Sequence, residues 1–273
     1  METYSVLMSV YAKEKPDYLA AAMKSMFTQS IPPSDFVLVC DGPLTTELNN
    51  VIEEFQAQYG DLLNIIRLKE NCGLGLALQK GISACKSALV ARMDSDDISV
   101  KNRMELLLPE MIKDPLLGAV GGQIAEFQDT VENVLAERRV PLLYKDIKKR
   151  IKYRNPMNHV TTLLRKEAVI QVGNYDNLNG FEDYYLWARL LSSGYHLKNL
   201  DIVCCYVRVG DNMYRRRSGM QYFQSVFRME GYLEQLGLIN SFQFTANIMI
   251  RCCVAAVPNW LRRFFYMNFL RKT

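Results

Sequence analysis

The stretch that decides the fold is residues 88–97, which read ALVARMDSDD. Its first six residues are apolar except for Arg92 and have the length and composition of a buried strand. Three carboxylates follow within the next four positions. Sheets of parallel strands bind ligands at the carboxyl ends of those strands, so we expect residues 88–93 to form a strand that ends at a polar site.

The three carboxylates repel one another unless a cation lies among them. Carboxylate oxygens are ligands that Mg²⁺ and Mn²⁺ prefer, and such a metal stabilises a departing diphosphate. A solvated acidic turn or a helix N-cap is the alternative, because Asp is common at both. The position of Asp94 directly after a buried strand favours the metal interpretation.

Apolar runs alternate with helical patterns on both sides of this stretch. Strands are expected at 5–10, 36–40, 62–68, 119–127, 134–139, 160–164 and 200–209, and helices at 16–27, 46–59, 75–86, 101–113, 144–153, 182–193 and 221–236. In the first hundred residues this alternation is typical of an α/β fold whose parallel sheet is covered on both faces. Asp41, like Asp94, follows such a strand.

The amino-acid composition and the charge distribution exclude several classes of protein. The chain has 273 residues, 49% hydrophobic and 23% charged, which excludes a disordered or low-complexity protein. The net charge of +4 is concentrated near the end, because no acidic residue follows Glu234 and residues 235–273 carry five basic groups. The rest is nearly neutral, so we expect no nucleic-acid-binding face.

Cysteine and targeting patterns indicate a reducing compartment. Seven cysteines without a Cys-x-x-Cys pair, together with only two histidines, argue against structural zinc and favour buried thiols. The N-terminus leads straight into an apolar strand, so we expect no signal peptide. No run of about 18 uncharged apolar residues predicts a membrane span; the nearest, 242–260, contains Arg251 and Pro258.

Several separated segments resemble the inverting family 2 glycosyltransferases, which have the GT-A nucleotide-sugar-binding fold. The order and spacing of these segments match across residues 5–217. They are Ser9-Val10-Tyr11, Val39-Cys40-Asp41-Gly42, Asn71-Cys72-Gly73-Leu74-Gly75, Asp94-Ser95-Asp96, and Glu182-Asp183-Tyr184 with Trp187. The resemblance implies a Rossmann-like sheet with flanking helices, and a C-terminal helical tail near the membrane.

The resemblance also implies a nucleotide-sugar site. Its candidate residues are Val10, Tyr11, Asp41, Asn71, Gly73, Arg92, Asp94, Ser95 and Asp96. Asp41 is expected to bind the uracil, while Asp94 and Asp96, with His159 as a further candidate ligand, hold Mn²⁺ or Mg²⁺. Many members have Arg-Asn where this chain has Leu78-Gln79, which leaves Lys80 or Arg92 for the diphosphate.

Asp183 is the candidate catalytic base, with Glu182 beside it. Sugar transfer with inversion needs a group that takes a proton from the acceptor hydroxyl. Negative charge is favoured near a helix start, and a neighbouring carboxylate raises the pKa of the base. The alternative is that both residues simply cap their helix.

A narrower resemblance points to the branch that builds bacterial surface polysaccharides, including amylovoran and O-antigen enzymes. It rests on residues 91–97, on Asn155-Pro156-Met157-Asn158-His159, and on 207–210 followed by two arginines. It implies an acceptor sugar linked to undecaprenyl diphosphate. The candidate acceptor or diphosphate ligands are His159, Trp187, Arg208, Arg215 and Arg216. A hydrogen-bonded loop histidine, a packed tryptophan and a solvated basic loop are the alternatives.

The C-terminal tail combines aromatic side chains with its five basic charges. The aromatic residues are Phe242, Phe244, Trp260, Phe264, Phe265, Tyr266 and Phe269. This composition suits an anionic membrane surface. A helix packed on the body with solvated arginines is the alternative.

We therefore expect three parts and one reaction. Residues 1–97 form the nucleotide-sugar-binding half, 98–217 the acceptor half, and 218–273 a membrane-associated helical segment. The expected enzyme transfers galactose or glucose from a UDP-sugar to lipid-linked GlcNAc or GalNAc with a β-linkage. It would work in the cytoplasm, peripheral on the inner face of the bacterial plasma membrane.

Two other functions fit the sequence less well. A nucleotidyltransferase would need a glycine-rich basic loop after the first strand, where residues 11–15 read YAKEK. A non-catalytic nucleotide-sugar-binding scaffold at the membrane would have no need of Asp94, Asp96 and Asp183, which are all present.

Overall fold

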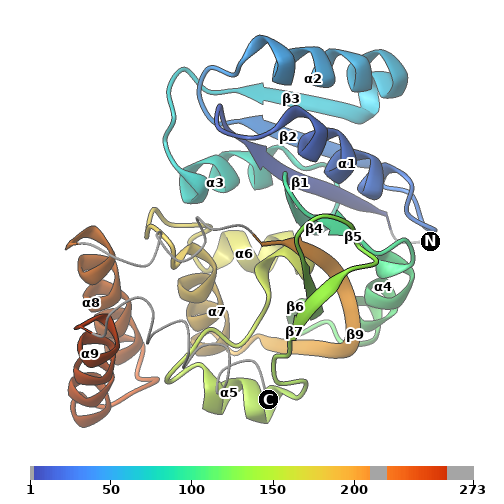
Figure 1. The fold of residues 1–273 in the computed structure, drawn as a ribbon. Coiled ribbons are helices and arrows are strands. Elements are labelled where there is room, and N and C mark those ends of the chain that lie inside the picture. The colour runs from blue at the N-terminus through green and yellow to red at the C-terminus, as the bar shows by residue number, and fades with distance from the viewer. Residues whose placement is uncertain (1–2, 210–219, 257–273) are drawn as a thin grey trace.

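The computed structural model describes residues 3–209 and 220–256, and these form a single nine-stranded sheet with helices around it (Figure 1). The strand order is β3-β2-β1-β4-β8-β6-β9-β5, with β7 paired to β6. The strands are β1 (Tyr4–Val10), β2 (Asp35–Cys40), β3 (Leu63–Arg67), β4 (Leu89–Asp94), β5 (Ile98–Ser99), β6 (Leu117–Phe127), β7 (Val134–Arg138), β8 (Leu163–Arg165) and β9 (His196–Arg208).

The first four strands are parallel, as the apolar runs predicted. Residues of β1 alternate between two cores, so that Val6 packs with α1 (Pro16–Phe27) and α2 (Thr46–Tyr59), while Leu7 packs with α3 (Leu74–Ala84). In Figure 1, α1 and α3 accordingly lie on opposite sides of this part of the sheet. The register pairs Ser9 with Asp94 and Val10 with Cys40, so three strand ends meet at one edge.

The second half of the sheet mixes directions. β8 runs antiparallel to both β4 and β6, whereas the long strands β6 and β9 are parallel to each other. Its helices are α4 (Arg103–Lys113), α5 (Tyr144–Arg150), α6 (Lys166–Gln171) and α7 (Glu182–Ser192). The expected strand 160–164 is partly wrong, because a 3₁₀ turn occupies His159–Thr161 and β8 begins only at Leu163.

Two further helices, α8 (Met220–Gln235) and α9 (Ser241–Ala256), form the α8–α9 hairpin, which packs beside α7 (Figure 1). The rings of Tyr185 on α7 and Tyr232 on α8 stack with centroids 4.2 Å apart. Within residues 3–209 and 220–256, every helix falls short of the length and apolar character that crossing a bilayer requires. The predicted site residues Arg215 and Arg216, and the tail from residue 257, lie outside the described residues.

Candidate active site

A hollow of about 270 Å³ lies where the first two strands end. Its walls are Tyr11, Ala12, Lys13, Asp41, Gly42, Pro43 and Asn71. The structure thus brings together three of the residues predicted for nucleotide-sugar binding, Tyr11, Asp41 and Asn71. Val10 is buried directly behind them at the end of β1.

Asp41 holds the loop that closes this hollow. Its two carboxylate oxygens accept hydrogen bonds from the backbone N–H of Cys72 at 2.7 Å and of Gly73 at 3.0 Å. The Asn71 side-chain amide donates to the Asp41 carbonyl at 3.1 Å. Gly73, with φ of +88°, is the N-cap of α3, a backbone conformation that favours glycine. Asp41 therefore positions the loop 71–73, in addition to its predicted contact with the uracil.

The three carboxylates at the end of β4 form one cluster. Oxygens of Asp94, Asp96 and Asp97 lie within 4.8 Å of one another. Burial, reinforced by the charges of Asp94 and Glu14, raises the pKa of Asp96 to about 7. Burial and its two acidic neighbours likewise raise the pKa of Asp97. The three carboxylates therefore stay close at an electrostatic cost that a cation among them would relieve.

This cluster fits a divalent cation. Its donor atoms are hard carboxylate oxygens, and Asp94 and Asp96 are partly exposed. Asp97 is 3% exposed and accepts a hydrogen bond from the backbone N–H of Arg208 at 2.8 Å, so it ties β9 to the site. The neighbouring Ser95 hydroxyl donates to Glu14 at 2.6 Å.

Arg92 lies at the centre of the charged groups. It is 2% exposed and makes an ion pair with Asp94. Its charge lowers the pKa of Asp96 and Asp97 in the cluster and of Glu182 and Asp183 at the start of α7. One buried guanidinium thus acts on both acidic sets that the sequence singled out.

Asp183 is held by two hydrogen bonds at the N-terminus of α7. Its Oδ2 accepts from the Asn155 side-chain amide at 2.6 Å, and its Oδ1 accepts from the backbone N–H of Tyr184 at 2.7 Å. Burial raises the pKa of Asp183, and these hydrogen bonds oppose that rise. Burial, rather than the Glu182 carboxylate invoked from the sequence, is the main cause.

Glu182 is itself 7% exposed, and burial raises its pKa to about 7, with a smaller contribution from the charge of Asp183. The pair therefore binds protons more readily than two solvated carboxylates. A carboxylate in such surroundings is a stronger base than one in water.

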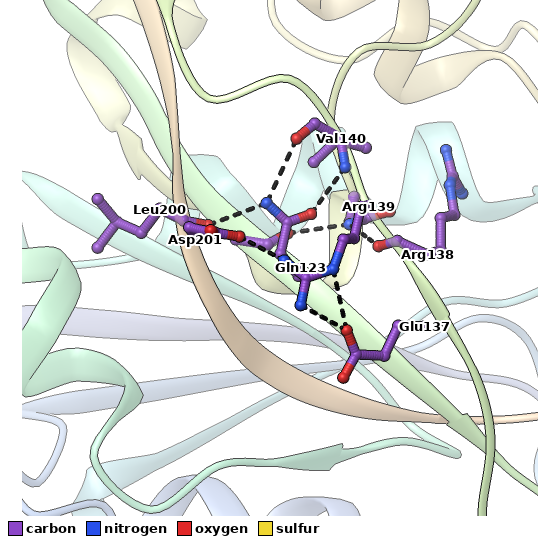
Figure 2. A network of polar contacts seen from close by, with 9 residues as sticks. Gln123, Glu137, Arg138, Arg139, Val140, Leu200 and Asp201 are labelled. Carbon is purple, nitrogen blue, oxygen red and sulfur yellow. Dashed lines mark hydrogen bonds and ion pairs between the residues drawn. The ribbon is translucent and has the colours of Figure 1, made fainter. Parts of the chain in front are cut away.

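A second arginine faces Asp183 from the end of β7. The charge of Arg138 lowers the pKa of Asp183. Figure 2 shows the polar network that holds this strand end: the Gln123 side chain donates to the carbonyls of Val140 and Leu200 and accepts from the Val140 backbone N–H at 2.7 Å.

The ion pairs of Arg139, which follows Arg138 in the sequence, extend the same network (Figure 2). Arg139 pairs with Glu137 at 2.7 Å and with Asp201 at 2.6 Å. These contacts fasten β7 to β9, so the position of Arg138 is set by both strands.

His159 and Trp187 lie deeper than the sequence suggested. The Nε2 atom of His159 is hydrogen-bonded to the Tyr175 hydroxyl at 2.8 Å, and burial lowers the pKa of His159, which keeps the ring neutral. Among the described residues, His159 is not part of the carboxylate cluster. Trp187 is 0% exposed and meets the His159 ring edge-on, so its packing supports His159 rather than presenting a face to a sugar.

Arg208 is fixed beside the carboxylate cluster. Its guanidinium lies over the rings of Tyr18 at 3.9 Å and Phe127 at 4.5 Å, and its Nε donates to the Asp96 carbonyl at 3.3 Å. It therefore remains a candidate for binding a diphosphate next to the carboxylate cluster.

Sequence reasoning gave no role to Asn155, Arg138 or Glu14. Asn155 belonged to a segment quoted for the family resemblance, so a signal was present without an assigned task. Arg138 and Glu14 meet the site only through folding, from positions 45 and 82 residues away from Asp183 and Asp96 along the chain. No local pattern marks either residue.

The two halves of the site meet at Gly75. A Cβ at this position would lie 2.3 Å from the Asp176 carbonyl oxygen and 3.1 Å from the Glu182 side chain. The first turn of α3 therefore approaches the segment before α7 more closely than any larger residue allows.

Residues 5–173 match the family model described as glycosyl transferase family 2. The chain belongs to this family. The transferase is 35% identical over 268 residues to the amylovoran biosynthesis glycosyltransferase AmsE of Erwinia amylovora, covering 96% of this chain and 97% of the relative. It is 32% identical over 271 residues to the UDP-Gal:alpha-D-GlcNAc-diphosphoundecaprenol beta-1,3-galactosyltransferase of Escherichia coli, covering 98% and 97%.

Both relatives confirm the predicted likeness to the surface-polysaccharide branch, and family membership favours a glycosyltransferase over the two rival functions. Solved structures confirm the GT-A fold of the transferase. S. aureus TarS residues 1–349 in complex with UDP-GlcNAc superpose with a TM-score of 0.66 at 16% identity, covering 98% of this chain and 76% of TarS. A Pyrobaculum calidifontis mannosyltransferase in complex with GDP-Man and Mn²⁺ gives 0.63 at 14% identity, covering 97% and 78%.

Replacing Gly75 by alanine is expected to destabilise the transferase. The added methyl group collides with a backbone carbonyl, and overpacking of this kind costs about 1–3 kcal/mol of unfolding free energy. Urea denaturation measures the change. Gly231→Ala is the matched control, because a Cβ there meets nothing within 4 Å and the helix gains alanine's higher propensity. A Gly75→Ala protein as stable as wild type would refute the close approach.

Proposed function

We propose that this transferase moves a hexose, galactose or glucose, from a UDP-sugar to a GlcNAc or GalNAc carried on a polyprenyl diphosphate, with inversion to a β-linkage, during bacterial surface polysaccharide synthesis. The observation that carries the proposal is the convergence of two acidic sets on buried Arg92: the cluster beginning at Asp94 and the Glu182–Asp183 pair. The name of the Escherichia coli relative supports the choice of acceptor class, and the name of AmsE supports a role in polysaccharide synthesis.

The donor side follows from the strand ends. The hollow beside Asp41 would receive the uracil, with Gly73 fixed by the Asp41 carboxylate and the Asn71 side chain fixed by the Asp41 backbone carbonyl. Asp94 and Asp96 would hold Mn²⁺ or Mg²⁺, which when bound supplies positive charge beside the diphosphate. Arg92 would add a fixed positive charge, and its Nε and Nη1 have no hydrogen-bond partner among the described residues.

Asp183 would act as the base. An acceptor hydroxyl that approaches the carboxylate gives up its proton to Asp183 as the hydroxyl oxygen attacks the anomeric carbon from the side opposite the leaving diphosphate. The hydrogen bonds from Asn155 and from the Tyr184 backbone fix the direction of the carboxylate. Burial raises its pKa and so strengthens the base.

Asp183→Asn is expected to lower kcat by at least about 100-fold, since a positioned general base contributes about 10²–10⁴ in rate. The Kd for UDP should stay within about twofold, because Asp183 does not line the uracil hollow. UDP release with a synthetic GlcNAc-diphosphate-lipid measures the first quantity, and calorimetry measures the second. Asp61→Asn, at an exposed residue of the 3₁₀ turn Gly60–Leu62, is the control. Near-normal turnover of Asp183→Asn would remove Asp183 from this role.

We also propose that the transferase works on the inner face of the plasma membrane as a peripheral protein. The supporting feature is an exposed apolar face on α9, where Phe242 is 82% exposed and Met249 and Ile250 are each 61% exposed. Exposed apolar clusters of this kind mark interaction surfaces. The basic-aromatic sequence that follows the described residues extends the same chemistry.

A basic helix ends close to α9. The exposed lysines Lys145, Lys148 and Lys149 lie on α5. The end of α5 is close to α9, because the Asn247 amide donates to the Lys152 carbonyl at 2.8 Å. An apolar patch beside positive charge suits a bilayer containing anionic lipids, which is where a polyprenyl-linked acceptor resides.

Replacing Phe242, Met249 and Ile250 together by serine is expected to reduce binding to phosphatidylglycerol-containing liposomes at least about fivefold, because buried apolar area drives such binding. Co-sedimentation of the full-length protein measures it. Ile112→Ser with Leu116→Ser is the matched control, since these residues are about equally exposed but lie at the other end of the fold. Equal loss in both proteins, or no loss in the α9 variant, would exclude α9 as the contact.

A further inference from the structure

The segment 151–155, which follows α5, connects the α8–α9 hairpin to Asp183. The Ile151 carbonyl accepts from the Tyr184 hydroxyl at 2.6 Å. The next two carbonyls, of Lys152 and Tyr153, accept from hairpin side chains, as described below. Asn155 then donates to Asp183 at 2.6 Å. Hydrogen bonds from α7 and from the hairpin thus fix the backbone of residues 151–153. Two residues later, Asn155 contacts the candidate base Asp183.

The hairpin grips this segment through α9. Asn247 donates to the Lys152 carbonyl at 2.8 Å, and Arg251 donates to the Tyr153 carbonyl at 3.2 Å. A third α9 side chain contacts the same segment, because the Gln243 amide donates to the Tyr153 hydroxyl at 3.3 Å.

A buried carboxylate fixes both gripping side chains. Glu230 on α8 is 0% exposed. Its Oε2 accepts from the Asn247 amide at 2.8 Å, and its Oε1 pairs with Arg251 Nε at 3.0 Å. A charge buried this deeply is costly unless it is paired, so Glu230 strongly favours the orientation in which Asn247 and Arg251 point toward residues 152 and 153.

We propose that the α8–α9 hairpin is a working part of the active site: through Asn247 and Arg251 it fixes the backbone of residues 152–153, and this backbone holds the Asn155 amide against the Asp183 carboxylate. Asn155 is a positioning residue for the base, and Asn247 and Arg251 act one step further back. The inference rests on the proposed function, in which Asp183 takes the proton.

The short distances make the hydrogen bond between Asn155 and Asp183 sensitive to small backbone shifts at residues 152 and 153. Only one residue separates Tyr153 from Asn155, so a backbone shift at the grip reaches the amide almost undiminished. A hydrogen bond of 2.6 Å is lost when its atoms separate by a further ångström. Misplacement of a catalytic group by about 1 Å can cost about 100-fold in rate.

The charges around Asp183 give the sign of the expected pH effect. Arg92 of β4 and Arg138 of β7 face it with positive charge, while Glu182 adjoins it and Tyr175 lies near. The Asn155 amide stabilises the charged carboxylate and therefore lowers its pKa. Removing this amide raises the pKa, so the acidic limb of the kcat/KM profile moves to higher pH.

The test is a double-mutant cycle on the full-length protein. Asn155→Ala is expected to lower kcat about 10-fold or more, with KM for the UDP-sugar within about twofold, and to move the acidic limb upward. Asn247→Ala should lower kcat about threefold to tenfold and move the limb in the same direction. Because both act through one contact, the double variant should match Asn155→Ala alone.

Thr245→Ala is the control on the hairpin, since this exposed α9 residue bonds only within its own helix. It should match wild type in every measurement. The proposal would be overturned if the double variant lost kcat by the product of the two single losses. It would also be overturned if Asn247→Ala had the pH profile of the wild type. Should Asn247→Ala fail to fold, Arg251→Lys replaces it, because it keeps the charge beside Glu230 but shortens the reach to Tyr153.

Amide hydrogen exchange provides a readout that needs no turnover. Asn247→Ala should speed exchange in residues 151–155 and in the first turn of α7, where Thr245→Ala does not. Unchanged exchange at α7 would overturn the coupling even if the wild-type protein transferred no sugar. Absence of transfer by the wild type, together with faster exchange at α7, would instead count against the proposed function and leave the coupling standing.

Discussion

Arg92 carries a positive charge into the interior at the point where the two halves of the sheet meet, and the site is arranged around that charge. A buried guanidinium is costly unless it is paired or hydrogen-bonded. Asp94 pairs with it directly, and its charge also acts on the acidic groups at the start of α7. Without this cation, both sets of carboxylates would lose a positive charge that stabilises their ionised forms.

A second buried arginine holds the backbone of β4 where its pairing with β8 ends. That pairing stops at Ala91, whereas the pairing of β4 with β1 continues to Asp94. The fully buried Arg103 donates to the carbonyls of Arg92 at 2.8 Å and Thr162 at 3.1 Å. The Arg92 backbone N–H also donates to the Thr162 carbonyl. Arg103 thus supports the backbone where β8 ends its pairing, and β4 continues beside β1 to the acidic residues of the site.

Sequence periodicity predicted the long elements well, because an apolar stripe on a helix such as α1 or a fully buried strand such as β2 is set by burial alone. It missed β5 and α6, which span two and six residues and are too short for a period to appear. The acidic residues at strand ends and at the start of α7 were also predictable, since their chemistry is local. The partners of Asp183 were not, because Asn155 and Arg138 reach it through the packing of β7 and the segment after α5. Trp187 is fully buried, in keeping with the packed tryptophan that the sequence left open as an alternative to sugar stacking.

The attachment of the hairpin to residues 151–155 bears on how such enzymes diverge. C-terminal segments are an obvious unit to exchange between relatives when a new acceptor or membrane is wanted. In this fold, transferred helices would bring the hydrogen-bond donors Asn247 and Arg251 of α9. They would not bring the residues 152 and 153 whose carbonyls accept these hydrogen bonds. A functional chimera would therefore have to transplant residues 151–155 together with 220–256, two pieces that lie far apart in the sequence. Evolutionary recombination at a single crossover is correspondingly constrained, and the hairpin and the loop are expected to change together.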